Sequence, residues 1–143
     1  MTPTPEEVSK MTTICETGFT AYSGIKVGKL AEGYAEGMID VQEHHLNPRG
    51  TIHGGLLYVL TDTIGGLATR TVNGMDNFVP STASSSISYL KPTIGTKKLI
   101  AKANVIKFGR RLSVVQTNVY DENDTLLATS LSNYANIEHK VNQ

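Results

Sequence analysis

One acidic side chain stands inside a long apolar run of the sequence. Between Gly54 and Thr69 every residue is uncharged except Asp62. Because a carboxylate is costly to remove from water, this group must either reach solvent or be held in place for chemistry. A solvated surface position and a catalytic acid both fit the pattern at this point.

Two glycines, Gly54 and Gly55, open the same run directly after His53. At the start of a helix they would present free backbone N–H groups at the positive end of the helix dipole, and their missing side chains would let another molecule approach closely. Such donors stabilise a developing oxyanion, and losing one costs enzymes about 2.7–4 kcal/mol of transition-state stabilisation. The alternative is that the glycines only permit a sharp turn into the helix or tight packing.

The spacing of His53 and Asp62 puts them on opposite sides of one helix. Nine residues at about 100° each leave half a turn, over a rise of about 13.5 Å. The two side chains therefore cannot meet within one chain. If both serve one site, one of them comes from a second subunit related by a two-fold axis, the commonest symmetry of oligomers. The spacing predicts a dimer with two composite sites.

The helix face around Asp62 also carries Gly65 and Gly66, each about 1 kcal/mol less favourable than alanine inside a helix. We expect close approach of a partner subunit to justify this cost. The residues of that face are Tyr58, Asp62, Gly65, Gly66 and Thr69, and those of the opposite apolar stripe are Leu56, Leu57, Leu60, Ile64, Leu67 and Ala68.

Two helices position these groups. Thr4 as N-cap, Pro5 at the first helical position and Glu7 at the third form a capping box, which predicts a helix over 5–20. The three-and-four spacing of the apolar stripe predicts a second, buried helix over 53–71.

Strands account for most of the remaining chain. Alternation in "YAEGMIDV" predicts two strands between Ile25 and Val41, joined by a tight turn near "AEG". The fold class is α+β: one long helix wrapped by a curved antiparallel sheet and preceded by an N-terminal helix. Four more strands, separated by short turns and hence antiparallel, are expected at "STASSSISYL", "KKLIAKANVIKF", "RLSVVQTNVYD" and "TLLATSLSNYA".

Composition narrows the function classes. The chain has 143 residues, 39% of them hydrophobic, which predicts one domain over 1–143. Its 13 basic and 13 acidic side chains cancel, so no electrostatic binding of nucleic acid or of an anionic membrane is expected. With one cysteine, no signal-like leader and no apolar run of about 18 residues, a cytoplasmic protein is predicted.

Other candidate constellations are assigned no chemistry. His44, His45 and His53 lie close in sequence, but adjacent histidines in an extended loop point in opposite directions, and no cysteine or paired carboxylate completes a tetrahedral metal set. Cys15 is expected to be a small buried or half-buried side chain. The serines of "STASSSIS" lack the G-x-S-x-G turn of a serine hydrolase, so a polar strand facing the site explains them more simply.

One pattern covers nearly the whole chain: Asn47, then Gly50, "HGG" at 53–55, Asp62 with small residues after it, "SYLKP", and "GRRLSVV". This pattern resembles the hotdog-fold acyl-CoA thioesterases, specifically the branch typified by the phenylacetate-degradation (PaaI-like) thioesterase. The resemblance implies a long helix wrapped by an antiparallel sheet and active sites between two subunits.

The resemblance also implies a role for each matching residue. Asp62 would be the catalytic carboxylate, acting as nucleophile or as general base for water. Gly54 would donate its N–H to the thioester carbonyl, with Gly55 beside it as a substrate contact. Asn47 would position the attacked group or the water, and His53 would support the carbonyl.

The family often has a serine or threonine on a strand near the carboxylate. Counting back from "YLKP", Thr82 is the best match, with Ser81 or Ser84 in its place if the register slips. Aspartate rather than glutamate at position 62 favours the phenylacetate branch.

Hydrolysis of the thioester of an aryl- or medium-chain acyl-CoA is the expected function, without a cofactor or metal, in a homo-oligomer that is a dimer of dimers. Arg110 and Arg111, with Lys107 nearby, are candidates for binding the phosphates of coenzyme A, although ordinary solvated charges fit them equally well. Two alternatives stay open: an acyl-thioester hydratase or dehydratase, and a non-catalytic acyl-CoA-binding regulatory module. Such a module usually needs a DNA-binding attachment, for which the roughly 20 residues before the first strand are too few.

Overall fold

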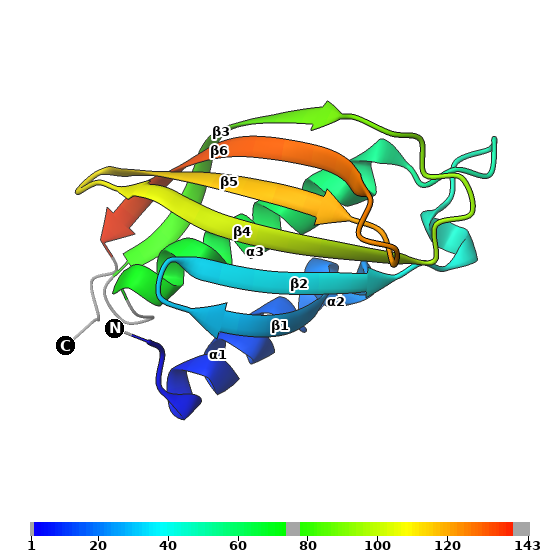
Figure 1. The fold of residues 1–143 in the computed structure, drawn as a ribbon. Helices are drawn as coiled ribbons and strands as arrows, with labels where there is room; N and C mark the ends of the chain where they lie inside the picture. The colour runs from blue at the N-terminus through cyan, green and yellow to red at the C-terminus, as the bar shows by residue number, and fades with distance from the viewer. Residues whose placement is uncertain (1, 74–77, 139–143) are drawn as a thin grey trace.

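The computed structural model describes residues 2–73 and 78–138, which form a six-stranded antiparallel sheet curved around one long helix (Figure 1). The strand order is β1-β2-β4-β5-β6-β3. None of the helices in the described ranges is long and apolar enough to cross a membrane. The helices are α1 (Pro5–Cys15), α2 (Gly18–Tyr22), the 3-10 helix η1 (Glu43–His45) and α3 (Gly54–Asn73), and the strands are β1 (Lys26–Ala31), β2 (Tyr34–Asp40), β3 (Phe78–Tyr89), β4 (Lys98–Phe108), β5 (Leu112–Tyr120) and β6 (Leu126–Glu138).

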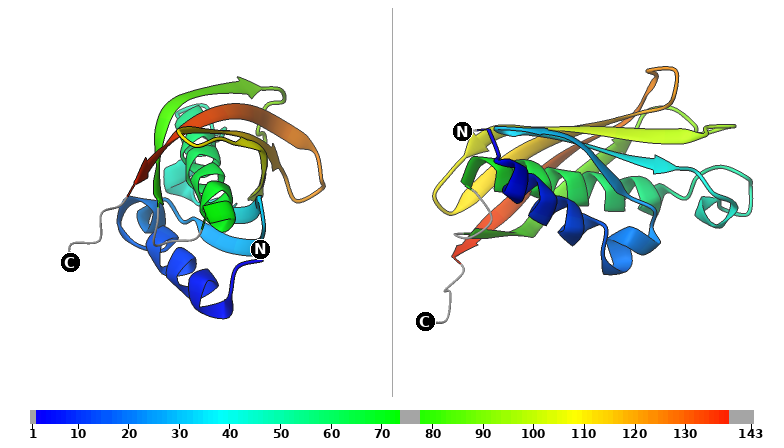
Figure 2. Two further views of the ribbon diagram at one scale, coloured as in Figure 1. Left: turned by 90° about the vertical axis from the view of Figure 1, so that its left-hand side faces the viewer. Right: turned by 90° about the horizontal axis from the view of Figure 1, so that it is seen from below.

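The central helix α3 forms where its apolar spacing predicts it. Every residue of the predicted stripe is buried, and the curved sheet encloses the helix (Figure 2). Gly37 of β2 lets the helix come close, because a Cβ there would overlap Cδ1 of Ile64. The predicted α+β arrangement is confirmed, with the core between α3 and the sheet.

The N-terminal helix is shorter than predicted. Its capping box is present: Thr4 Oγ1 accepts from the Glu7 N–H at 3.2 Å, and Glu7 Oε2 accepts from the Thr4 N–H at 2.8 Å. A single helix over 5–20 is nevertheless wrong, because α1 and α2 are separate elements. Thr17 between them is extended, and Gly18 has a φ of 64°, a left-handed conformation that glycine adopts at little cost.

The two strands predicted between Ile25 and Val41 are confirmed as β1 and β2. The chain reverses at Gly33, whose φ is 70°. Ala35, Gly37 and Ile39 are buried, whereas the residues between them are half-buried, so the period-two pattern holds.

The four strands predicted after the central helix are present as β3 to β6. Within the described part of the chain, β3 pairs with β6 alone and forms one edge of the sheet. Most of its 12 residues are exposed. This edge strand therefore presents unpaired backbone groups along its outer side.

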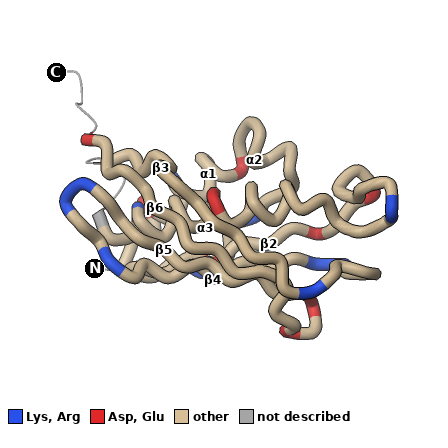
Figure 3. Tube along the Cα trace, turned by 90° about the horizontal axis from the view of Figure 1, so that it is seen from above, with Lys and Arg blue, Asp and Glu red and all other residues tan. Residues whose placement is uncertain are grey.

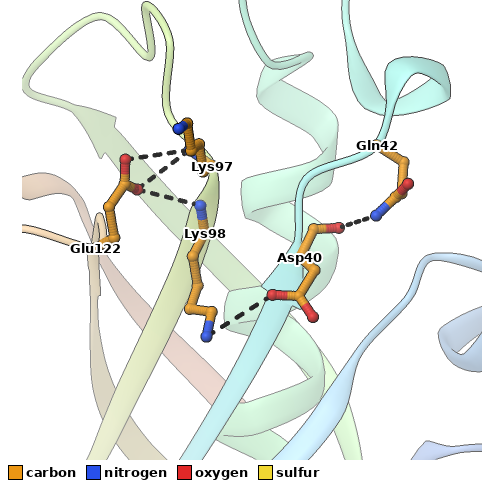
Figure 4. Close-up of polar contacts among 5 residues, drawn as sticks. All are labelled: Asp40, Gln42, Lys97, Lys98 and Glu122. Carbon is orange, nitrogen blue, oxygen red and sulfur yellow. Dashed lines mark hydrogen bonds and ion pairs between the residues drawn. The ribbon is translucent and has the colours of Figure 1, made fainter.

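Polar contacts close the end of the sheet where β2, β4 and the β5–β6 turn meet (Figure 4). Glu122 accepts hydrogen bonds from the backbone N–H groups of Lys97 and Lys98, each at 3.1 Å, which fixes the turn to the start of β4. Lys98 Nζ lies 3.8 Å from Asp40 Oδ1, and Gln42 Nε2 donates to the Asp40 carbonyl at 3.3 Å. Exposed pairs of this kind order a surface locally and add little to stability.

Candidate active site

Asp62 meets Thr82 where α3 passes the edge strand β3. Thr82 Oγ1 donates to Asp62 Oδ1 at 2.5 Å, a short hydrogen bond. The residue that sequence matching favoured is therefore the one that binds the carboxylate, rather than Ser81 or Ser84. Because Asp62 is half-buried, this contact defines its direction in a site that solvent still reaches.

The glycine pair of α3 makes room for a tyrosine of the same chain. Tyr134 of β6 is 1% exposed, and its hydroxyl donates to the Asp62 carbonyl oxygen at 2.8 Å. A Cβ on Gly65 would overlap that hydroxyl, whereas one on Gly66 would meet Tyr134 and Pro80 at ordinary contact distances. The expectation that a partner subunit explains this pair is wrong for Gly65, which the packing of Tyr134 requires.

A pocket of about 180 Å³ opens beside Asp62. Thr82 and Tyr134, which both bond to Asp62, belong to its wall. The N-terminal helices and α3 supply further wall residues, so the pocket mixes apolar and polar groups. The helices contribute Ile14, Cys15, Thr20, Leu67 and Arg70, and β3 adds Pro80.

Cys15 is a buried wall residue rather than a nucleophile. Its side chain is 3% exposed. Burial raises the pKa of the thiol to about 11, even though the charge of Arg70 acts in the opposite direction. Since the thiolate is the reactive form, a protonated thiol here is chemically inert near neutral pH.

In the described ranges, the start of α3 presents one free backbone N–H, that of Gly54, rather than the two that are expected from Gly54 and Gly55. Gly55 donates its N–H to Nδ1 of His53 at 2.8 Å, and Leu56 donates to the His53 carbonyl at 2.9 Å. For Gly54, the described residues provide no hydrogen-bond acceptor to its N–H. The expectation of a free N–H on Gly55 is therefore wrong. His53 caps the helix through Nδ1, which leaves the proton of a neutral ring on Nε2.

Tyr89, at the end of β3, covers the same helix start. Its hydroxyl donates to the Gly54 carbonyl at 2.7 Å, and a Cβ on Gly54 would lie 3.1 Å from the hydroxyl oxygen. Burial raises the pKa of this phenol, with a smaller contribution from Tyr58. No local sequence pattern links Tyr89 to Gly54, because the two residues lie 35 positions apart.

A second pocket, of about 230 Å³, opens at this helix start. Gly54, Asn47 and Tyr89 line it together with two cations, Arg49 and Lys91. Sequence reasoning missed both cations. A basic residue in the loop before the helix and another after β3 could have signalled an anion-binding end of the site.

Asn47 shapes the loop that leads into α3. Its Nδ2 donates to Thr51 Oγ1 at 2.7 Å, and its Oδ1 accepts from the N–H groups of Arg49 and Thr51 at 3.0 and 3.2 Å. Gly50 completes the turn with a φ of 82°. The side chain is thus held by its own loop, and it lines the same pocket as Gly54.

Arg110 and Arg111 occupy the exposed turn between β4 and β5. Asn136 fixes this turn by donating Nδ2 to the Gly109 carbonyl at 2.7 Å and its backbone N–H to the Arg111 carbonyl at 2.9 Å. Neither arginine lines either pocket. The basic turn projects from the end of the molecule away from the start of α3 (Figures 1 and 3), so the structure does not bring these residues to Gly54 within one chain.

The adjacent histidines lie in η1 and not in an extended loop, so that expectation is wrong. Nδ1 of buried His45 accepts from the Gln42 N–H at 2.9 Å, and Nε2 donates to the Ser23 carbonyl at 2.9 Å. Burial lowers the pKa of His45, and nearby His44 lowers it further. Among residues 2–73 and 78–138, no cluster of three or more metal-ligating side chains is found.

The two halves of the candidate site are separated along α3. Gly54 precedes Asp62 by eight residues, about 12 Å along an unbroken helix. The two pockets have no wall residue in common in the described chain. One chain therefore presents a carboxylate with a hydroxyl in one place, and a backbone donor with two cations in another.

The fold and this site define a class of protein. Residues 49–128 match the family model described as the thioesterase superfamily, and the chain belongs to that superfamily of thioester hydrolases. Its hotdog fold and the predicted resemblance are thereby confirmed.

Individual relatives agree with the family. "Putative esterase SSO1253" of Saccharolobus solfataricus is 32% identical over 113 residues, which cover 79% of this chain and 73% of that protein. The thioesterase HI1161 of Haemophilus influenzae superposes with a TM-score of 0.85 at 24% identity, covering 99% of this chain and 97% of that one.

Two further solved structures bear on the branch and the ligand. A mutant of the phenylacetic acid degradation protein PaaI from Thermus thermophilus has a TM-score of 0.73 at 30% identity, covering 82% of this chain and 96% of that one. The protein smu.793 of Streptococcus mutans, solved with bound acetyl-CoA, has a TM-score of 0.72 at 25% identity, covering 80% and 89% respectively.

Proposed function

We propose that this protein hydrolyses the thioester of aryl- or medium-chain acyl-CoA in active sites shared by two subunits. The observation that carries the proposal is the hydrogen bond from Thr82 to the Asp62 carboxylate inside a pocket. A half-buried carboxylate in a defined direction beside a small pocket is what attack on an acyl carbon needs.

Asp62 acts on the thioester carbonyl as general base or as nucleophile. As a base it takes a proton from water while the water oxygen attacks, the carbon–sulfur bond breaks, and the proton passes to the departing thiolate. As a nucleophile it forms a mixed anhydride and expels the thiolate, which takes a proton from solvent; water then hydrolyses the anhydride to the free acid and regenerates Asp62. In both cases Thr82 binds Oδ1, so Oδ2 is the oxygen that acts.

The oxyanion is stabilised by the Gly54 N–H of the second subunit. The rise of about 12 Å between Gly54 and Asp62 is too long for one carbonyl group to touch both within a chain. A two-fold axis that sets two α3 helices side by side in opposite directions would bring one subunit's Asp62 to the other's Gly54.

The exposed edge strand β3 supports this assembly. Its outer backbone groups are available to pair with the same strand of a second copy, and antiparallel pairing about a two-fold axis reverses the direction of the second α3. The further pairing of dimers into a tetramer, and the cytoplasmic location, stay predictions from the sequence.

Coenzyme A is proposed to approach from the pocket at Gly54. Arg49 and Lys91 line that pocket and can neutralise phosphates, and one neighbour was solved with acetyl-CoA. Phosphate binding by Arg110 and Arg111 would require them to come from another subunit, and it stays a prediction.

The acyl group is proposed to enter the pocket beside Asp62. That pocket is small, whereas the pantetheine arm is long and must lead out to the nucleotide, so the acyl end is the part that fits. Ile14 and Leu67 supply apolar wall for an aryl ring or a moderate alkyl chain.

A thiol-release assay tests the function. Purified protein is offered phenylacetyl-, hydroxybenzoyl- and straight-chain acyl-CoA, with Asp62→Asn as the comparison. We expect turnover by the wild type and a loss of at least about a thousandfold in kcat for the variant, as for other essential bases or nucleophiles. Wild-type rates in the variant would overturn the proposal, and binding without any thiol release would indicate a sensor module.

A further inference from the structure

Tyr134 is the one buried tyrosine that bonds directly to the residue carrying the proposed reaction, among the residues the structure describes. We propose that Tyr134 is a positioning residue. Its hydroxyl holds the backbone of α3 at Asp62 in the place where Thr82 can bind the Asp62 carboxylate. This inference rests on the proposed function of Asp62. It assigns Tyr134 a task in orientation and no contact with substrate.

Asp62 is held at two points by a pair of facing residues. Thr82 of β3 and Tyr134 of β6 are direct partners in the antiparallel register, so their side chains project from the same face of the sheet. Thr82 reaches the carboxylate at 2.5 Å and Tyr134 reaches the backbone carbonyl at 2.8 Å. Thr82, Tyr134 and the backbone of Asp62 are thus linked to one another, and we call these three residues the Asp62 frame.

The register of β3 shifts immediately after this pair, between Thr82 and Ser84. Such irregularities bend a strand and re-aim its side chains, and they are frequent beside active sites. Here the shift follows directly on the threonine that binds the carboxylate.

The missing side chain of Gly65 makes room for the hydroxyl of Tyr134 and not only for its ring. A Cβ at Gly65 would overlap the Tyr134 hydroxyl oxygen, whereas a Cβ at Gly66 would lie 3.7 Å from Cε1 of the Tyr134 ring. Glycine is unfavourable in the middle of a helix, so its presence where the hydroxyl reaches the backbone indicates that this contact matters. Burial raises the pKa of the Tyr134 phenol, which keeps it a donor at neutral pH.

The frame predicts a specific kinetic signature. Tyr134→Phe keeps the ring but removes the hydrogen bond, so we expect kcat to fall by about tenfold or more with KM changed by less than about twofold, since small displacements of a catalytic group have effects of this order. Thr82→Ala combined with Tyr134→Phe should lose little more than the worse single variant, because both act on the same carboxylate position.

Tyr120→Phe is the matched control. The Tyr120 hydroxyl lies on β5, where Asn118 Nδ2 contacts it at 3.4 Å, away from the Asp62 frame. We expect this variant to keep wild-type kcat. Activity is expressed per folded molecule after thermal unfolding is measured, so a merely structural role of Tyr134 would lower Tm and leave kcat unchanged.

Gly65→Ala provides a second route to the same displacement if Tyr134→Phe does not accumulate as folded protein. The added methyl group pushes the hydroxyl from its place while both hydrogen-bonding residues remain, and we expect the same loss of kcat. Wild-type kcat in the folded variant tested, or effects of Thr82→Ala and Tyr134→Phe that multiply, would overturn the positioning role. If the wild type releases no thiol, or Asp62→Asn does so normally, the proposed function itself is wrong.

Discussion

Thr82 of the edge strand donates a 2.5 Å hydrogen bond to Asp62 of the central helix. The contact joins residues 20 positions apart in sequence and fixes the direction of a carboxylate that would otherwise rotate freely. Most of the proposed chemistry depends on that direction.

Thr82→Ala is therefore expected to reduce kcat by about ten- to a hundredfold, as loss of an orienting hydrogen bond does, with KM nearly unchanged. Thr82→Ser keeps a hydroxyl and should recover a substantial part of the rate. Steady-state thiol release with a phenylacetyl or hydroxybenzoyl thioester measures both. Equal rates for the alanine variant and the wild type would show that the contact is incidental.

Subunit complementation tests the shared site. Asp62→Asn and Gly54→Pro should each be inactive alone, the second because proline fits the first position of α3 but has no N–H to donate to the oxyanion. Co-expressed, random pairing gives half mixed dimers with one intact site each, so about a quarter of wild-type activity should return. No recovery in a sample shown to contain mixed dimers would contradict a site built from two subunits.

Arg49→Gln and Lys91→Gln are expected to raise KM for acyl-CoA by about tenfold each, because an ionic contact to phosphate is lost, while kcat stays near wild type. A truncated thioester without the nucleotide should show no such change. Arg110→Gln, at the distant basic turn, is the matched control for surface charge. If that variant raises KM while the other two do not, the phosphates are bound at the turn.

Low pH should destabilise the fold through His45. The native ring accepts from Gln42 at Nδ1 and donates to Ser23 at Nε2, so a second proton would break the first contact. Since burial lowers the native pKa of His45, the unfolded chain takes up its proton first. This contribution is complete above about pH 6.5 and declines as pH falls below it, by at most about 1.4 kcal/mol per pH unit for one proton.

Denaturant unfolding between about pH 7.5 and 5 measures this slope, within the ordinary titration range of histidine. His45→Gln does not titrate and should lose the slope together with part of the stability at neutral pH. His44→Gln, an exposed neighbour, should largely retain it. An identical pH dependence in the wild type and His45→Gln would exclude this histidine as the cause.

Local patterns predicted most of the fold. The capping box at Thr4, the buried stripe of α3 and the alternation around Ala35 and Ile39 each depend on neighbours within a few residues, and all three are observed. The break near Gly18 was missed because a left-handed glycine leaves no periodic signal in a short helix.

The candidate site was only partly predictable, for a physical reason. Asp62 could be predicted because it is the one charge in an apolar helix segment, and Gly54 because it belongs to a glycine pair at the start of that helix. Tyr89, Arg49 and Tyr134 join the site through strand register and loop closure, which no short window of sequence encodes. For the same reason, the sequence predicts that a second subunit packs against Gly65, whereas the structure places Tyr134 of the same chain there.

The pocket beside Asp62 combines parts of different origin. Asp62 and Thr82 fall within the stretch that the superfamily shares, residues 49–128, whereas Ile14, Cys15 and Thr20 lie before it. Under the proposed function, substitutions in the N-terminal helices would therefore alter which acyl group is accepted, while Asp62 and Thr82 stay intact. In evolutionary terms, acyl specificity and hydrolysis would then be encoded by separate parts of the chain, so that one could change without the other.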